Sequence, residues 1–203
     1  MNKLTKTAST LRNIFNIAEK VLMAGTIAAL VCVILAVGCL LLGVDPDLIG
    51  TGYENLNIGV LKLQIADGFA PDKNIVLIKV AIFIALIGGC CLIGWKMVRS
   101  INAILDPISQ GRPFHSAISA ELKKLAIYSV GLGVVLNLFG LTDLIFNAFI
   151  YDLPDLLISE KITHVGLDYT IDISFLICSG ILLLLSYIFR YGSELQQLSD
   201  ETL

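Results

Sequence analysis

The chain has 203 residues, of which 56% are hydrophobic and only 15% are charged, whereas a typical soluble domain carries about 25% charge. The net charge of −3 gives no basis for direct nucleic-acid binding. The composition therefore favours an integral membrane protein, and the length fits a single domain over residues 1–203.

The N-terminal part of the chain predicts a basic helix followed by a membrane span. In residues 1–20, apolar or small side chains recur every three or four positions, which keeps one face of a helix apolar. This segment is either an amphipathic helix on the anionic inner leaflet or an early extension of the first span. Residues 21–44 carry no charge. A helix of that length, roughly 36 Å, is long enough to cross a bilayer.

An acidic connection follows, and part of it has the period of a β-strand. Within residues 55–66, apolar side chains alternate with small or polar ones, and the register changes near Val60 and Leu61. This pattern predicts a small extracytoplasmic β-ribbon, with an irregular loop on the helix ends as the alternative. The next apolar run, residues 75–98, is the second predicted span, and Trp95 lies near its inner end, as an interfacial anchor would.

The second and third predicted spans are joined by a polar connection over residues 99–124. Its middle contains residues that favour turns, namely Asp106, Pro107, Gly111 and Pro113. We therefore expect the second helix to end before a tight turn. His115 follows this turn at a helix start, where a capping or solvated histidine is more common than a metal ligand.

A short amphipathic helix leads from the turn into the third span. Ser116 is its candidate N-cap, and Ile118, Leu122 and Leu125 form an apolar stripe. This helix either skims the inner leaflet before it enters the membrane or presents a docking face for a cytoplasmic protein. The docking interpretation, which includes the end of the fourth helix, selects Pro113, Phe114, Glu121, Lys124, Arg190, Glu194 and Gln196.

The third and fourth predicted spans are residues 125–150 and 171–189, and residues 190–203 form a tail that continues the last helix into water. The third span carries a stripe of polar or small residues spaced four apart, Ser129, Gly133 and Asn137. On the second span, Ala81, Ala85 and Gly89 also fall four apart, and that stripe of small residues allows the close approach of another helix.

Charged residues also occur inside or at the ends of the spans. Because charges in a membrane normally face inward and pair, we expect Lys79 to pair with Asp143 or Asp172, with Asn147 as a hydrogen-bonding neighbour. This intramembrane polar group is either a clamp that holds the helices in register or a pocket that senses a ligand, a cation or protons. We favour the clamp.

The distribution of positive charge predicts the orientation. Ten of the 14 Lys and Arg residues lie in the N-terminal segment, the tail, and the 99–124 connection with its span ends. This asymmetry places both termini in the cytoplasm. Four spans with short internal connections predict an all-α membrane protein, an antiparallel four-transmembrane-helix bundle.

The sequence offers little support for catalysis. It contains no HExxH, Gly-x-Ser-x-Gly or P-loop motif, and His115 and His164 are predicted on opposite sides of the membrane. All five cysteines fall in apolar runs, which gives no disulfide framework. We therefore expect a non-enzymatic protein without a cofactor or metal. A small transporter or immunity-type protein that uses the intramembrane polar group is the alternative to a docking function.

Two segments resemble a known family. They are Gly111-Arg112-Pro113-Phe114 with Leu122-Lys123-Lys124-Leu125-Ala126, and Ile188-Phe189-Arg190-Tyr191-Gly192-Ser193-Glu194-Leu195-Gln196-Gln197 with Asp200-Glu201-Thr202-Leu203. They resemble the bacterial four-span membrane proteins called domain of unknown function 2975. This chain departs from that family by having His115-Ser116 where members often have a capping Ser or Thr directly after the Phe. The resemblance implies a location in the bacterial plasma (inner) membrane. It also implies a partner, a small cytoplasmic helix-turn-helix regulator, so that the chain would be a signalling anchor for a transcription factor.

Overall fold

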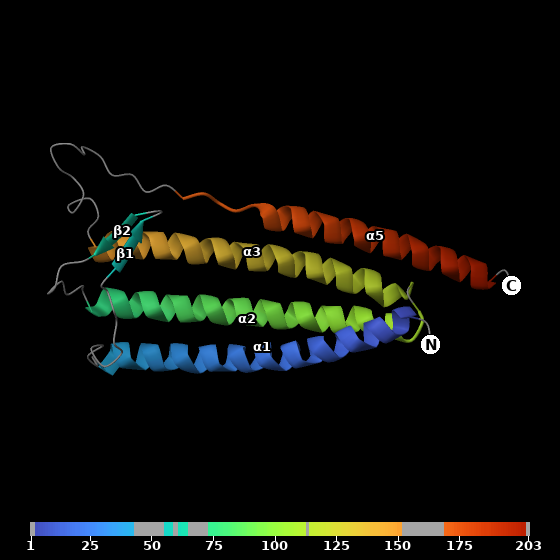
Figure 1. Ribbon diagram of the computed structural model, residues 1–203, viewed down its shortest axis with the longest axis horizontal. Coiled ribbons are helices and arrows are strands. Elements are labelled where there is room, and N and C mark those ends of the chain that lie inside the picture. The colour runs from blue at the N-terminus through green and yellow to red at the C-terminus, as the bar shows by residue number, and fades with distance from the viewer. Residues whose placement is uncertain are drawn as a thin grey trace. The chain divides into compact units, whose positions relative to one another are not determined.

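The computed structural model describes residues 3–42, 55–58, 61–64, 73–112, 114–151 and 169–201. These residues form four long helices, α1 (Lys3–Leu42), α2 (Lys73–Ser109), α3 (Ser116–Tyr151) and α5 (Ser174–Glu201), and one pair of short strands (Figure 1). Each helix contains a stretch long and apolar enough to cross a membrane. Large apolar side chains lie exposed along all four helices, as expected where lipid is the solvent. The chain is therefore a multi-pass membrane protein by the length and composition of its helices.

The chain divides into two compact units. The first contains residues 1–29, 86–138 and 170–203, and the second contains residues 30–85 and 139–169. Helix α5 belongs to the first unit alone, whereas α1, α2 and α3 each contribute to both.

The second unit includes the two strands, β1 (Asn55–Ile58) and β2 (Leu61–Gln64). They pair antiparallel, with Asn55 opposite Gln64 and Ile58 opposite Leu61. Both strands lie inside the segment in which the alternating pattern was found. The change of register expected near Val60 falls partly outside the described residues, and the side of the membrane on which the pair lies stays a prediction.

A cluster of buried apolar side chains lies near the start of α3. Ile118, Leu122 and Leu125 are buried, and Ile118 has no exposed surface. They pack against Met97, Ile101, Ile104 and Ile108 of α2 and against Leu182 and Phe189 of α5. The expectation that this stripe contacts the leaflet or a partner is therefore wrong, because α2 and α5 already cover it.

The connection between α2 and α3 is shorter than residues 99–124, because both helices extend into that range. Helix α2 continues through Pro107 to Ser109, so Asp106 and Pro107, which were expected in the turn, lie in the helix. Gly111 follows the end of the helix, and its φ of 79° is left-handed and suits glycine. The Arg112 N–H donates to Pro107 O at 2.9 Å and the Gly111 N–H to Ile108 O at 3.0 Å. These two bonds satisfy the last carbonyls of the helix.

The start of α3 is capped by a histidine. The Ala117 N–H donates to His115 Nδ1 at 3.2 Å, and the Ile118 N–H donates to His115 O at 3.0 Å. His115 therefore occupies the N-cap position, and the prediction of Ser116 as the cap is wrong by one residue. Ser116 is the first residue of the helix.

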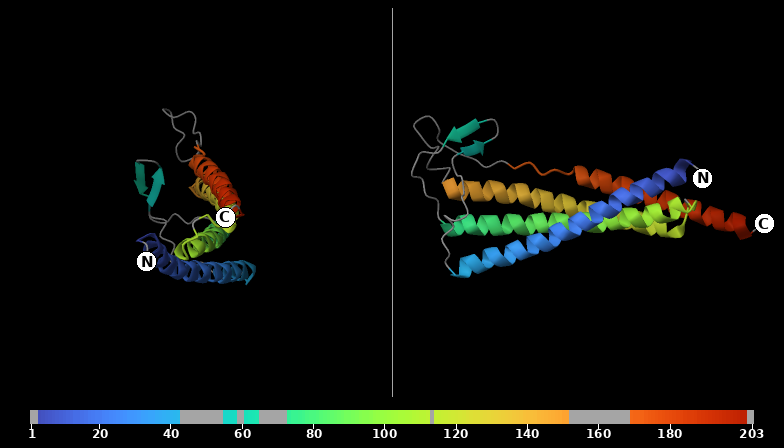
Figure 2. Two further views of the ribbon diagram at one scale, coloured as in Figure 1. Left: turned by 90° about the vertical axis from the view of Figure 1, so that its right-hand side faces the viewer. Right: turned by 60° about the horizontal axis from the view of Figure 1, so that its bottom comes forward.

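Helix α5 lies along α3 within the first unit (Figure 2). Three serines of α5 spaced seven apart, Ser179, Ser186 and Ser193, are buried. The Ser186 hydroxyl donates to Ser119 O of α3 at 2.8 Å. Small polar side chains on this face let the two helices approach closely.

Candidate functional site

A groove of about 460 Å³ lies between the first turns of α3 and the second half of α5. We call it the α3–α5 groove, and both of its walls belong to the first unit. Its polar lining comes from both helices: Ser116, Ser119 and Lys123 of α3, and Ser186, Tyr187, Arg190, Ser193, Glu194 and Gln197 of α5. The groove thus combines hydroxyl groups with charges of both signs.

Helical spacing explains this lining. On α3, positions 116, 119 and 123 are three and four residues apart, which places them on one face of the helix. On α5, positions 186, 190 and 197 recur at the same kind of interval. The sequence analysis did not select Lys123, although polar residues at this spacing on both segments were a signal that could have identified it.

The residues selected for docking divide between the groove and its surroundings. Arg190 and Glu194 line the groove and form an exposed ion pair, with Arg190 Nε 3.0 Å from Glu194 Oε1. Lys124 does not line it and pairs with Glu121, with 2.6 Å between Nζ and Oε1. Gln196 is exposed outside the groove lining. Pro113 lies outside the described residues, as does His164.

Phe114 connects the inter-helix turn to α5. Its ring centroid lies 6.0 Å from that of Phe189, and a Cβ added at Gly192 would lie 2.8 Å from Phe114 Cδ1. Gly192 therefore provides the space that Phe114 occupies. Phe114 is still 46% exposed, so the aromatic ring serves the fold and also remains accessible next to the tail.

The second unit holds most of the predicted intramembrane polar group. Lys79 Nζ lies 3.0 Å from Asp143 Oδ1 and donates to Asn147 Oδ1 at 2.5 Å. The ammonium also lies 5.4 Å from the centroid of the Phe83 ring, a distance suited to a cation–π contact. The Lys79 side chain is 18% exposed and that of Asp143 is 50% exposed. Two of the predicted neighbours therefore surround Lys79.

Asp172 has a different role, at the start of α5. Its backbone N–H donates to Asn137 Oδ1, and the Asn137 amide donates back to Asp172 O, both at 2.9 Å. Its carboxylate accepts hydrogen bonds from the Ser174 hydroxyl and from the Ser174 N–H, the latter at 2.8 Å. Asp172 is therefore a helix cap.

These hydrogen bonds make the cap depend on pH. The bond from the Ser174 hydroxyl, followed by the bond from the Ser174 N–H, lowers the pKa of the Asp172 carboxyl. A lowered folded-state pKa means that the cap is fully present above the ordinary value, about 3.9 for Asp. Its contribution is lost as the pH falls through the lowered pKa.

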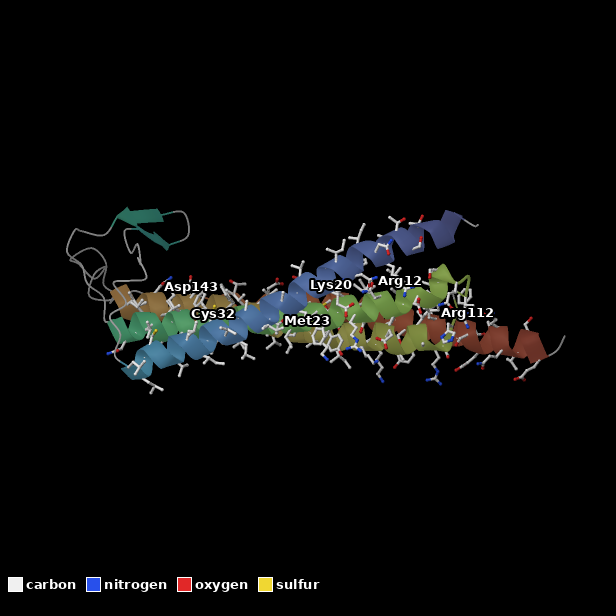
Figure 3. All side chains as sticks on the ribbon, turned by 90° about the horizontal axis from the view of Figure 1, so that it is seen from below. Arg12, Lys20, Met23, Cys32, Arg112 and Asp143 are labelled. Atoms are coloured by element: carbon white, nitrogen blue, oxygen red, sulfur yellow. The ribbon has the colours of Figure 1, made fainter. Side chains whose placement is uncertain are left out.

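A set of contacts that the sequence analysis did not predict joins α1 to the end of α2. Arg12, which is labelled on α1 in Figure 3, places its Nη1 2.6 Å from Asp106 Oδ1. The Asn102 amide donates to Asn16 Oδ1 and to Glu19 Oε2, each at 3.0 Å. Positions 12, 16 and 19 are four and three apart, which could have indicated a polar face on α1. Both members of the Arg12–Asp106 pair are more than 40% exposed, so the pair contributes about 0–1 kcal/mol.

Among the described residues, no group of three or more His, Cys, Asp or Glu side chains is arranged to hold a metal ion. Comparison with models of known protein families finds no match for the chain, and neither do comparisons with curated proteins or with solved structures.

Proposed function

We propose that the chain is a non-enzymatic anchor in the bacterial plasma membrane that binds a cytoplasmic regulator in the α3–α5 groove. One observation carries this proposal: the groove joins the start of α3 to the tail of α5, two segments that sequence alone selected as docking faces. The positive-inside rule puts both segments in the cytoplasm. The resemblance to a bacterial four-span family adds the expectation that the regulator is a small helix-turn-helix protein.

The chemistry of the groove suits a polar or charged segment of the partner. Its walls offer hydroxyls, the Lys123 ammonium and the Arg190–Glu194 ion pair. An exposed ion pair within one helix contributes about 0.3–0.5 kcal/mol, so a partner can open it at little cost and use both charges. A regulator held between two helices would respond to any movement of α5 along α3, which makes the anchor a candidate signalling device.

The groove can be tested with two neighbouring lysines. In crosslinking pull-downs from native membranes, Lys123→Glu is expected to reduce recovery of a cytoplasmic DNA-binding protein at least ten-fold, because the new carboxylate faces the groove. Lys124→Glu introduces the same charge one residue away, outside the groove lining, and should leave recovery within two-fold of wild type. Equal recovery with the two variants, or no such protein with wild type, would contradict docking in this groove.

The intramembrane polar group supports a second candidate, a small transporter or immunity-type protein. The half-exposed Asp143 carboxylate beside Lys79 and Asn147 could contact a cation or a toxin segment. Asp143→Asn keeps the size of the side chain and removes its charge. Under this candidate it should reduce ion flux or toxin protection at least ten-fold in cells, and unchanged values would leave the candidate without support.

A further inference from the structure

Helix α5 carries an apolar line along its whole length. Its members alternate at intervals of four and three residues: Ile177, Ile181, Leu184, Ile188, Tyr191, Leu195 and Leu198. All are exposed, by between 49% and 67%. We call this line the α5 seam. A repeat of seven residues is the repeat with which two helices pack at a crossing angle of about 20°.

The opposite face of α5 is already used inside the subunit. Ser179, Ser186 and Ser193 are buried, and Ser186 bonds to Ser119 of α3. In a heptad whose a and d positions form the seam, all three serines occupy position f, which points away from the seam. Helix α5 therefore has an internal serine face and, on its far side, the exposed seam.

Lipid can cover only part of the seam. Helix α5 has 28 residues, roughly 42 Å, whereas the hydrocarbon core is about 30 Å thick. Arg190 ends the charge-free run, and from residue 192 to 201 every residue except Leu195 and Leu198 is glycine or polar. Tyr191, Leu195 and Leu198 thus extend the same line beyond the hydrocarbon, where lipid tails cannot cover it.

We propose that the seam pairs with the seam of a second copy of this chain, as a parallel two-helix coiled coil that starts in the bilayer and continues into the cytoplasm. Copies inserted in the same orientation present α5 in parallel and at equal depth. Each seam residue then meets its own counterpart about a two-fold axis.

The charges along the seam and the surface area that it would bury are both consistent with pairing to a second copy of the chain. The seam contains no charged residue, and in the parallel register Glu194 at position g lies opposite Ser199 at position e, so no like charges meet. A fully exposed aliphatic side chain offers roughly 100 Å², and the seam side chains are only 49–67% exposed, so the seven from each copy would bury on the order of 800 Å² in total before flanking residues are added. This approaches the ~1,200 Å² at which specific interfaces begin, and confinement to a membrane raises the effective concentration.

Single cysteines test the register in the full-length chain, with the five native cysteines replaced by alanine. After copper-phenanthroline oxidation of native membranes, Leu195→Cys and Leu198→Cys should each convert most of the chain to a disulfide-linked dimer. Gln196→Cys and Gln197→Cys, on other faces of the same turns, should give at least ten-fold less. Equal yields at all four positions, no dimer at any, or crosslinking of 195 and 198 to a different protein would overturn the proposal.

A second measurement avoids cysteines. Two differently tagged copies expressed together should co-purify, and Leu195→Glu with Leu198→Glu should reduce co-purification at least ten-fold. Both positions are exposed in the single chain, so the fold should tolerate the charges. Gln196→Glu adds a negative charge off the seam and outside the groove lining, and it should leave co-purification unchanged. No seam residue lines the α3–α5 groove, so regulator docking can fail while pairing persists.

Discussion

Replacement of Gly133 by alanine should loosen α5 from α3 and lower the free energy of unfolding by about 1–3 kcal/mol. Gly133 is buried, and a Cβ added there would lie 2.5 Å from Phe175 Cβ and overlap the Phe175 ring. Rotation of the ring alone cannot relieve this overlap, because the Phe175 Cβ is fixed to the backbone in the first turn of α5. The helix itself would have to move.

Thermal unfolding in detergent measures this effect, and a chain of this size should lose about 2–4 °C in Tm per kcal/mol. Gly180→Ala is the matched control, since a Cβ at Gly180 meets nothing within 4 Å and alanine is the better helix former by about 1 kcal/mol. Adding Phe175→Ala to Gly133→Ala should recover part of the loss. A Gly133→Ala protein as stable as the Gly180→Ala protein would contradict the close packing of α5 on α3.

The number of membrane-spanning helices could be predicted from the sequence, but their ends could not. Long, predominantly apolar runs mark where lipid can surround a helix, and four such runs predicted the four helices of the described residues. A helix ends, however, where its backbone hydrogen bonds are capped. The last carbonyls of α2 are satisfied around Gly111, well beyond the apolar run, and α3 starts after the His115 cap. The composition of the chain does not directly indicate where α2 ends or where α3 begins.

Site residues could be predicted from the sequence where the chemistry of one residue limits the kinds of partner that it can have. A lysine inside a span needs an acceptor, which identified Asp143 and Asn147 as neighbours of Lys79. The sequence could not choose between Asp143 and Asp172, because that choice depends on where α5 begins. Likewise, a 3.6-residue period identifies an apolar face but not what covers it.

The two adjacent lysines of α3 also show that the sequence does not identify the neighbours of a side chain. Lys123 and Lys124 lie about 100° apart around the helix, and the sequence does not state which of them faces α5. The structure places Lys123 in the groove and pairs Lys124 with Glu121. A side chain's neighbours follow from the packing of whole helices, which a single segment cannot specify.

The second large effect should come from breaking the Lys79–Asp143 pair, and the two single variants should differ. Asp143→Ala leaves the largely buried Lys79 ammonium without its carboxylate and hydrogen-bonded to Asn147, which should cost roughly 1–3 kcal/mol. Lys79→Ala should cost less, because the remaining Asp143 carboxylate is half exposed and polar surroundings can solvate it. Tm values in one detergent give the comparison, and two unchanged single variants would contradict any clamp.

The double variant Lys79→Met with Asp143→Leu separates a clamp from a sensing pocket. Replacing both members of an ion pair with apolar residues of similar volume is often neutral or stabilising where the charges are buried. Lys79 is largely buried and Asp143 is half exposed, so the double variant should unfold within about 1 kcal/mol of wild type. If the pair only holds α2 and α3 in register, regulator recovery in the pull-down should also match wild type. If the charges sense a ligand, the double variant should keep its stability but lose the cellular response to that ligand. Neither single variant can give this result, because each also destabilises the fold.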